Sequence, residues 1–312
     1  MAGITFSPSK DIPSLSGRVI LITGANTGLG KEYALNLVKH RPAEVWLTAR
    51  DDAKGQAALS DVKGQASPET KVSLLNLDLS SFASVKATAD AFIRSTTRLD
   101  ILFLNAGMMG CPPAVSVDGY EIQFATNHLG HALLLKLLTP LLSKTAETVP
   151  AADVRVVSLS SVGYKHVTSG TIQFDTLQDA AKILDPNVVS PVQRYTQSKL
   201  ANLLYAQEFA KRHPQFTTVS VDPGAVTTEL FSREPGDEQM KMLQTVLAPK
   251  HGKPLVEGVK NPLWAATASS ELVQSGKFYE PVGKEALEGA GLNTALAKTL
   301  WEWTEEELRK HS

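Results

Sequence analysis

The chain has 312 residues, of which 43% are hydrophobic and 20% charged, and its formal net charge is −1. This balance is typical of a globular protein with a sizeable core, and no basic excess points to a nucleic-acid partner. The single cysteine, Cys111, excludes an internal disulfide and a metal site of several thiolates, and the seven histidines show no HExxH pairing.

Short apolar runs alternate along the chain with longer amphipathic segments. The apolar runs predict buried strands at 18–22, 44–48, 72–77, 101–104, 154–159 and 217–221, with a seventh strand starting near 278. The amphipathic segments predict helices at 30–39, 51–65, 81–96, 120–142 and 195–212. Strands and helices in this alternation are typical of βαβ units with right-handed crossovers. We therefore predict an α/β, doubly wound Rossmann fold: a single domain over residues 1–312 with a mostly parallel seven-stranded sheet flanked by helices.

Two segments interrupt this alternation, 162–194 and 232–261, and neither resembles a linker between domains. We expect both to be loops at the functional edge of the sheet. Apolar residues in and beside the second segment indicate an amphipathic lid over a hydrophobic substrate, although surface packing would give the same pattern. They are Phe231, Met240, Met242, Leu243, Val246 and Leu247.

The first strand ends in a glycine-rich turn that opens directly into a helix. Glycines let the backbone approach a pyrophosphate, and a helix N-terminus offers it free N–H groups. The spacing is GxxxGxG instead of the usual GxGxxG, so the glycines alone do not exclude a turn without a ligand. The predicted cofactor contacts in this turn are Gly24, Asn26, Thr27, Gly28, Leu29 and Gly30.

The second strand ends in arginine, where NAD enzymes usually carry an acid for the ribose hydroxyls. Arg50 suits a 2′-phosphate instead, which favours NADP(H) over NAD(H), although Asp51 and Asp52 follow it. Lys31 is expected to be a solvated helix lysine. Asp78, after the third strand, either accepts from the adenine amino group or belongs to the N-cap region of the next helix.

In their order and placement, these motifs resemble the short-chain dehydrogenase/reductase family from Gly17 to about Leu230. Asn105-Ala106-Gly107 resembles the family's motif that borders the cofactor, and the segment from Pro223 resembles its loop over the nicotinamide. The resemblance therefore adds eight residues to the expected cofactor contacts: Leu79, Asn105, Ala106, Gly107, Pro223, Gly224, Val226 and Thr228. The catalytic residues it implies are Asn127, Ser161, Tyr195 and Lys199. The TGANTG turn, the Ala49-Arg50 ending and the 34 positions from Ser161 to Tyr195 look closest to the retinol dehydrogenase-like and protochlorophyllide reductase-like group.

The resemblance implies hydride transfer between a nicotinamide and a carbonyl or alcohol, with Tyr195 as the general acid. Lys199 lies one helical turn later, where it is expected to lower the pKa of Tyr195 and to bind the hydroxyls of the nicotinamide ribose. Tyr195 and Lys199 are both expected to contact the cofactor. Ser161 would stabilise the substrate oxygen, and Asn127 would connect Lys199 to a proton relay. We predict an NADP(H)-dependent carbonyl reductase acting on a hydrophobic small molecule. A non-redox isomerase, dehydratase or cyclase and an NADP(H)-binding regulatory module remain open.

Several further expectations concern residues near the site and the state of the protein. Tyr164 is expected to pack against the 162–194 insertion, and His128 and His131 to pack or face a partner helix. Met108, Met109 and Cys111 either line a pocket or fill the core. The helix after Asn127 and the helix of Tyr195 resemble surfaces on which relatives dimerise, while relatives with long insertions are also monomers. Without a signal-peptide pattern or a membrane-spanning apolar stretch, the expected location is cytoplasmic.

Overall fold

Parallel strands at the centre of the molecule confirm the predicted doubly wound sheet. The computed structural model describes residues 4–149, 153–228, 230 and 234–311. In these ranges eight strands form one sheet in the order β3-β2-β1-β4-β5-β6-β7-β8. They are β1 (Val19–Ile22), β2 (Glu44–Ala49), β3 (Lys71–Asn76), β4 (Ile101–Leu104), β5 (Arg155–Leu159), β6 (Thr217–Val221), β7 (Phe278–Glu280) and β8 (Lys284–Glu285). The prediction of seven strands missed β8, because it is a two-residue antiparallel partner of β7 with no apolar run of its own.

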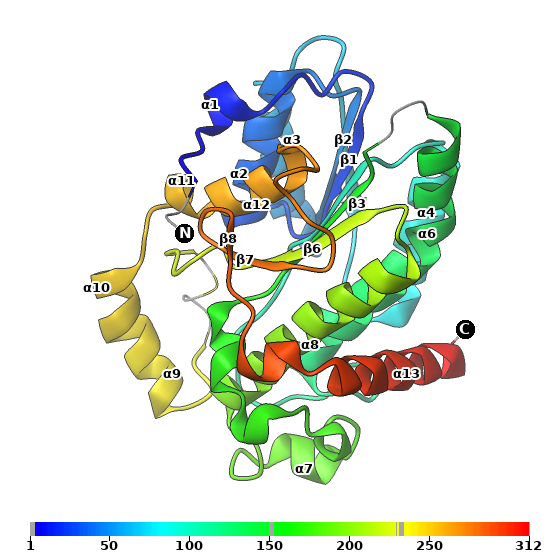
Figure 1. Cartoon of the computed structure of the whole chain (residues 1–312). Helices are drawn as coiled ribbons and strands as arrows, with labels where there is room; N and C mark the ends of the chain where they lie inside the picture. The colour runs from blue at the N-terminus through cyan, green and yellow to red at the C-terminus, as the bar shows by residue number, and fades with distance from the viewer. Residues whose placement is uncertain (1–3, 150–152, 229, 231–233, 312) are drawn as a thin grey trace.

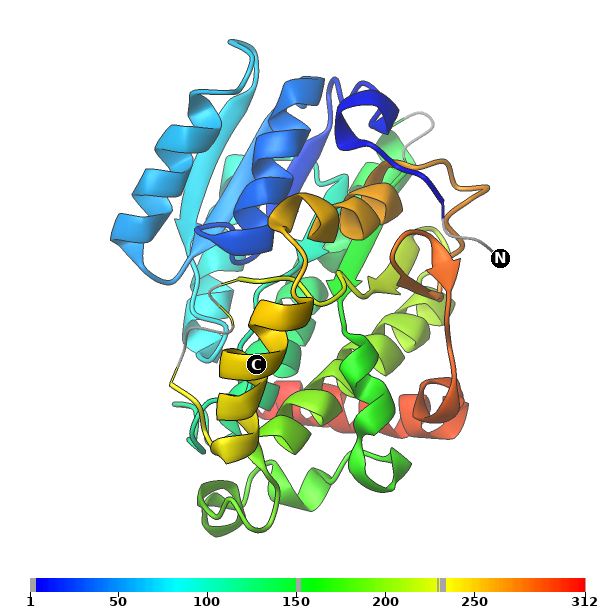
Figure 2. The same cartoon turned by 90° about the vertical axis from the view of Figure 1, so that its left-hand side faces the viewer.

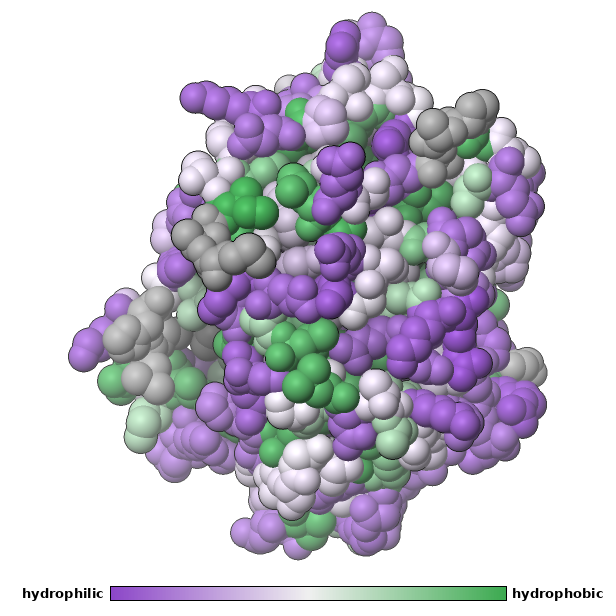
Figure 3. Space-filling view, viewed as in Figure 1, coloured by the Kyte–Doolittle hydropathy of each residue, from purple (hydrophilic) through white to green (hydrophobic). Residues whose placement is uncertain are grey.

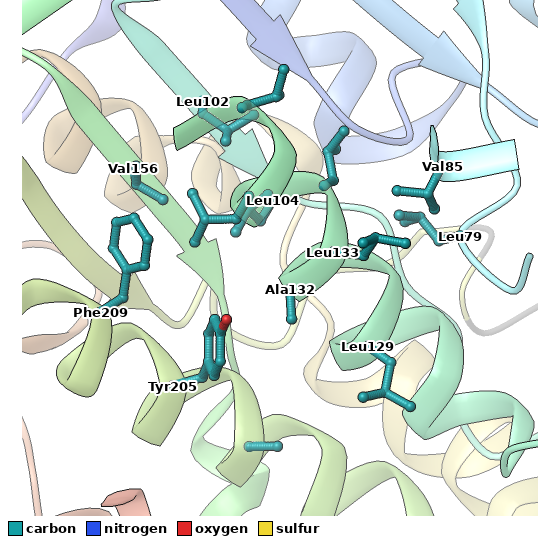
Figure 4. Packing of buried hydrophobic residues seen from close by; sticks show 14 of the residues in the cluster. Leu79, Val85, Leu102, Leu104, Leu129, Ala132, Leu133, Val156, Tyr205 and Phe209 are labelled. Carbon is teal, nitrogen blue, oxygen red and sulfur yellow. The ribbon is translucent and has the colours of Figure 1, made fainter. Parts of the chain in front are cut away.

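Helices cover both faces of this sheet (Figures 1 and 2). One face carries α2 (Gly28–Leu37), α3 (Asp52–Lys63) and α12 (Lys260–Thr267), and the other carries α4 (Phe82–Ser95), α6 (Gly130–Thr148) and α8 (Pro191–Arg212). All residues of β1 and β4 are buried, as expected for strands between two helix layers. Figure 4 shows Leu104 of β4 and Val156 of β5 between Leu133 of α6 and Phe209 of α8.

The strand order reverses beside β1, which pairs with β2 on one side and with β4 on the other. Chain segments leaving β1 and β4 therefore diverge to opposite faces of the sheet. In open parallel sheets this divergence creates a crevice at the carboxyl ends of the strands, where ligands bind. The glycine-rich turn after β1 and the segment after β4 lie at this crevice.

Two predicted helix boundaries differ from the structure in instructive ways. The helix expected at 120–142 consists of α5 (Ile122–Phe124), a π-helical turn η2 (Ala125–Leu129) and α6, which continues to Thr148. The helix expected from Tyr195 begins at Pro191, since Ser190 accepts a hydrogen bond from the Gln193 N–H as its N-cap. Tyr195 therefore lies inside the helix, where its backbone is fixed on both sides.

The two segments predicted as loops contain short helices, so that prediction was wrong for much of their length. The first holds η3 (Val162–His166), η4 (Thr168–Gly170), η5 (Phe174–Thr176) and α7 (Ala180–Leu184). The second holds α9 (Glu238–Met242), a π-helical turn η7 (Leu243–Leu247), α10 (Ala248–His251) and α11 (Leu255–Gly258). Helices of one or two turns are too short to show periodicity. Figure 1 shows α9 and α10 together as an arm at one edge of the molecule.

A long C-terminal helix, α13 (Thr294–Lys310), was not predicted at all. It lies along α8, as the red helix of Figure 1 shows, and buries Leu296, Leu300 and Leu308. The Trp301 ring stacks on Tyr205 of α8, with 4.7 Å between ring centroids. The chain's own last helix thus covers part of the α6 and α8 surface considered above for dimerisation. Figure 3 shows a mostly hydrophilic surface on this side, with hydrophobic residues in separate groups.

The remaining short elements are α1 (Pro8–Asp11), η1 (Val38–His40) and η8 (Gly289–Leu292). Within the described ranges, no helix combines the length and apolar character needed to cross a bilayer.

Candidate active site

A cleft of about 550 Å³ lies at the carboxyl ends of the central strands and extends from Arg50 to Tyr195. Most of the predicted cofactor contacts line it: Gly24, Asn26, Thr27, Gly28, Leu29, Gly30, Arg50, Asp78, Leu79, Asn105, Ala106, Gly107, Tyr195, Lys199, Pro223 and Thr228. Gly224 and Val226 are not among the lining residues. Val226 is buried and pairs with Lys253, and a Cβ on Gly258 would clash with its side chain, so Val226 packs toward α11.

The glycine-rich turn is shaped for close approach of a ligand to the backbone. Gly24 has φ +66°, and a Cβ there would lie 2.8 Å from the Ala106 Cβ. A Cβ on Gly30 would lie 2.4 Å from the Gly24 carbonyl oxygen. Thr27 is the N-cap of α2 but its side chain makes no capping hydrogen bond, so the helix N-terminus faces the cleft without a cap. This cradle fits the pyrophosphate of a dinucleotide.

The arginine at the end of β2 lies exposed at one end of the cleft. The neighbouring carboxylate of Asp51 accepts a hydrogen bond from the Lys54 N–H at 2.9 Å, as the N-cap of α3. Lys54 also lines the cleft, which the sequence analysis did not anticipate. Lys31 is instead paired with Asp61 at 2.5 Å and is not among the residues lining this cleft. This end of the cleft is therefore lined by two cationic side chains, Arg50 and Lys54, and one carboxylate, Asp51.

Asp78 combines features of both alternatives considered for it. Its Oδ1 accepts hydrogen bonds from the Ser80 N–H at 2.9 Å and the Ser80 hydroxyl at 2.6 Å. The N-cap of α4 is Ser81, whose hydroxyl accepts from the Ser84 N–H. Asp78 therefore closes a turn just before the helix and still lines the cleft.

Tyr195 and Lys199 lie at the opposite end of the cleft from Arg50. The Lys199 ammonium is buried, donates to the Leu159 carbonyl at 2.9 Å and lies 5.6 Å from the Tyr195 ring centroid. Burial lowers its pKa to about 8, against an opposing effect of the Asp222 carboxylate. A Cβ on Gly107 would lie 3.7 Å from Lys199 Nζ, so a glycine there keeps the ammonium accessible from the cleft.

The pKa of Tyr195 moves in the opposite direction from the one expected. Burial raises it, a hydrogen bond with Ser161 lowers it, and the Asp222 carboxylate raises it further. Burial is the largest of these effects, and the Lys199 ammonium donates to the Leu159 carbonyl. The Tyr195 side chain is therefore a protonated phenol at neutral pH, as a proton donor must be.

Ser161 is near Tyr195 but outside the residues that line the cleft. Its hydroxyl accepts from the Gly163 N–H at 3.1 Å. A Cβ on Gly163 would lie 3.3 Å from Ser161 Oγ and 3.7 Å from Tyr195 Cε1. Gly163 is therefore next to both the Ser161 hydroxyl and the Tyr195 ring, and its lack of a side chain leaves space beside them. The preceding Ser160 donates its hydroxyl to the Lys199 carbonyl at 2.7 Å, and this bond ties β5 to α8.

Asn127 is fully buried in the π-helical turn and does not line the cleft. Its Oδ1 accepts from the Met108 N–H at 2.8 Å, and its Nδ2 donates to the Met108 carbonyl and the Ser198 hydroxyl, each at 2.9 Å. The side chain thus clamps the segment after β4 onto α8. Only the Asn127 backbone is left for the relay role expected of this residue.

Asp222 is a buried acid at the site that the sequence analysis overlooked. It follows β6 directly, is 3% exposed, and its carboxylate accepts from the Val162 N–H at 3.3 Å. Burial raises its pKa to about 6. The sequence signal that could have identified Asp222 is its position between a buried strand and the Pro223-Gly224 pair. Among the described residues, no group of three or more histidines, cysteines and carboxylates is arranged to hold a metal ion.

The other aromatic and sulfur residues near the site have structural roles. Tyr164 packs edge-on against Phe278 of β7, with 5.3 Å between centroids, and its hydroxyl donates to the Ala286 carbonyl. It therefore packs against the C-terminal part of the chain, and it belongs to the same buried cluster as Ile172 and Leu177 of the insertion. Met108 lines the cleft, whereas Met109 and Cys111 are buried.

Comparison with known proteins agrees with this geometry. The short chain dehydrogenase family model matches residues 18–170. A short-chain dehydrogenase/reductase of Phomopsis amygdali is 33% identical over an alignment of 322 positions, which covers 97% of this chain and 92% of the relative. Retinol dehydrogenase 12 of Homo sapiens is 36% identical over 289 residues, 92% of this chain and 85% of the relative.

Solved structures show the same fold. A crystal structure of a protein from Mycobacterium paratuberculosis superimposes with a TM-score of 0.72 at 29% identity, covering 98% of both chains. The NADP complex of RhlG from Pseudomonas aeruginosa has a TM-score of 0.63 at 22% identity over 86% of this chain and 96% of that one. The resemblance seen in the sequence is thus confirmed, and the chain belongs to the short-chain dehydrogenase/reductase family of oxidoreductases.

Proposed function

We propose that the protein is an NADP(H)-dependent reductase of carbonyl groups on hydrophobic small molecules. The observation that carries this proposal is the single cleft that joins Arg50 at one end to Tyr195 and Lys199 at the other. A dinucleotide phosphate fits this arrangement, since its 2′-phosphate and its nicotinamide lie at opposite ends of an extended molecule. We also assign residues 1–312 to one domain, which the single sheet formed by the described strands supports.

The cleft residues have distinct parts in holding the cofactor. Gly24, Gly28 and Gly30, with the uncapped N-terminus of α2, would hold the pyrophosphate. Arg50 would pair with the 2′-phosphate, and Lys199 would donate to the ribose next to the nicotinamide. Pro223 and Thr228 border the same space, and Thr228 lies 3.7 Å from where a Cβ on Gly28 would be. When bound, the cofactor supplies the hydride.

The protein's own contribution is to deliver a proton to the oxygen of the substrate. Tyr195 holds that proton on its phenol oxygen, because burial keeps its pKa high. As negative charge develops on the phenol oxygen, the Lys199 cation stabilises it. Ser161, hydrogen-bonded to Tyr195, would donate its hydroxyl to the same substrate oxygen. Asn127 would act through its backbone, since its side chain is engaged by Met108 and Ser198.

A hydrophobic substrate is supported by the apolar residues at the cleft, among them Met108, Leu159 and Leu230. The described part of the proposed 232–261 lid, residues 234–261, is anchored beside it, since Met240 is fully buried and a Cβ on Gly110 would lie 2.2 Å from the Met240 sulfur. Met242 and Val246 are 57% and 54% exposed on the arm. Phe231 and the side chain of Leu247 lie outside the described residues.

The proposal is tested by NADPH oxidation against a panel of aldehydes and ketones of increasing apolar size. Tyr195→Phe should still bind NADPH but lose activity, because it keeps the ring and lacks the proton. Tyr164→Phe, which removes a hydroxyl outside the cleft, is the matched control and should remain active. An enzyme that binds NADPH, oxidises none of it and still converts a carbonyl-containing substrate would support a non-redox reaction. Binding without any conversion would support a regulatory module.

A further inference from the structure

A buried histidine links the catalytic asparagine to the cofactor end of the site. His131 of α6 is 4% exposed, and its Nδ1 lies 3.0 Å from the Asn127 carbonyl oxygen. Its Nε2 lies 2.9 Å from the Thr23 hydroxyl at the end of β1. The same hydroxyl is 2.8 Å from the Asn105 N–H and 3.0 Å from the Ala106 N–H. One imidazole therefore connects segments that are 108 positions apart in the chain.

The hydrogen bonds around His131 suit a neutral ring. The Asn127 carbonyl can only accept, so Nδ1 must carry a proton and donate it. The Thr23 oxygen accepts from two backbone N–H groups, and its one proton has two acceptors within reach, the Phe103 carbonyl at 3.1 Å and His131 Nε2 at 2.9 Å. A neutral ring with its proton on Nδ1 can accept the Thr23 proton at Nε2, the shorter of these two contacts.

The surroundings keep the ring neutral. Burial lowers the pKa of His131 to about 4, although the hydrogen bond to the Asn127 carbonyl raises it, and the nearby Lys199 cation lowers it further. Among the residues that the structure describes, the ionisable groups that affect it or are affected by it are Lys199 and His128, which is itself buried with a lowered pKa. The imidazole of the bridge is therefore neutral at neutral pH.

We propose that His131 is a positioning residue, which couples the Asn127 backbone to the cofactor-binding segment through Thr23. This inference rests on the proposed function, because its effect is on cofactor binding and turnover. A rigid link of this kind matters because it fixes the Asn127 backbone, the part of that residue through which it would act while its side chain is held by Met108 and Ser198. Displacement of catalytic groups by about 1 Å can cost about 100-fold in rate.

The same helical region contains a matched pair for comparison. His128 is also buried, and its Nε2 lies 3.0 Å from the hydroxyl of Thr304 in α13. Thr304 and Thr23 are both fully buried. His128 and Thr304 thus have the same chemistry as His131 and Thr23, but they join the π-helical turn η2 to the C-terminal helix α13, and neither lines the cleft. Variants of this pair separate a loss of folding stability from a loss of positioning.

The experiment uses His131→Leu, Thr23→Val and the double variant that combines them. The controls are His128→Leu, Thr304→Val and the double variant of those two. The NADPH Kd is measured by fluorescence titration, thermal unfolding by circular dichroism, and kcat on a substrate found in the panel. His131→Leu and Thr23→Val should each raise the Kd about 5- to 10-fold and lower kcat at least about 10-fold. The double variant should be no worse than the poorer single one, because both break one bridge. The control pair should lose thermal stability but keep Kd and kcat within about twofold.

Two results would overturn the inference: an unchanged Kd and kcat in folded His131→Leu, or additive effects in the double variant. Should His131→Leu fail to fold, His131→Asn takes its place, since the shorter side chain cannot span Asn127 and Thr23; it should show the same losses, and a wild-type Kd and kcat would overturn the inference. Failure of the wild type to bind NADPH would instead refute the proposed function, so the two failures are distinguishable.

Discussion

Replacement of Arg50 by alanine should abolish a preference for NADPH over NADH. The Arg50 side chain is exposed at the end of β2 and lines the cleft, while the Asp51 carboxylate is engaged by the Lys54 N–H. A hydrogen bond between charged groups contributes about 1.5–3 kcal/mol, and exposure to solvent favours the lower end of that range. Since about 1.4 kcal/mol is tenfold, the Kd for NADPH should rise about 10- to 30-fold. NADH has no 2′-phosphate, so its Kd should change less than about twofold.

Fluorescence titration with both cofactors, at low and moderate ionic strength, measures this difference. Added salt should weaken NADPH binding more in the wild type than in Arg50→Ala, because the variant has lost the screened interaction. Arg94→Ala is the control, since Arg94 is an exposed arginine of α4 outside the cleft. Equal losses for NADPH and NADH in Arg50→Ala, or the same loss in Arg94→Ala, would refute the assignment of Arg50 to the 2′-phosphate.

Three further predictions concern buried residues. Burial lowers the pKa of Lys199 from 10.5 to about 8, so the folded chain binds fewer protons than the unfolded chain between these values, and the free energy of unfolding should rise with pH there. Lys199→Met should lack that rise in urea denaturation and be about 2 kcal/mol more stable at pH 7, yet inactive. Leu300→Ala should cost about 2–4 kcal/mol, because Leu300 is fully buried in α13, and should promote self-association in gel filtration by loosening the helix from α8; an unaltered elution at high concentration would contradict this. Tyr164→Phe should lower the free energy of unfolding by about 1 kcal/mol with kcat unchanged, and a loss of activity would place Tyr164 in the mechanism.

The features determined by the sequence alone are those that local patterns encode. Apolar strands, the glycine turn between β1 and α2, and Arg50 at the end of β2 follow from neighbouring residues. The spacing of Tyr195 and Lys199 places both on one face of a helix, whatever the rest of the fold does. The order of these motifs was sufficient for the sheet and for most of the cleft.

Only the tertiary structure decided which groups these residues meet. Helix α13 finds its partners on α8, about 100 positions earlier in the chain, so local periodicity gave no reason to expect where it packs. The bridge from Thr23 through His131 depends on the junction of β1 and α6, and the Asp222 carboxylate is at the site because β6 pairs with β5. Even the direction of the Tyr195 pKa came from burial, which outweighs the lowering by the Ser161 hydrogen bond. Desolvation and hydrogen-bond partners are properties of the packed chain, and no spacing along the sequence specifies them.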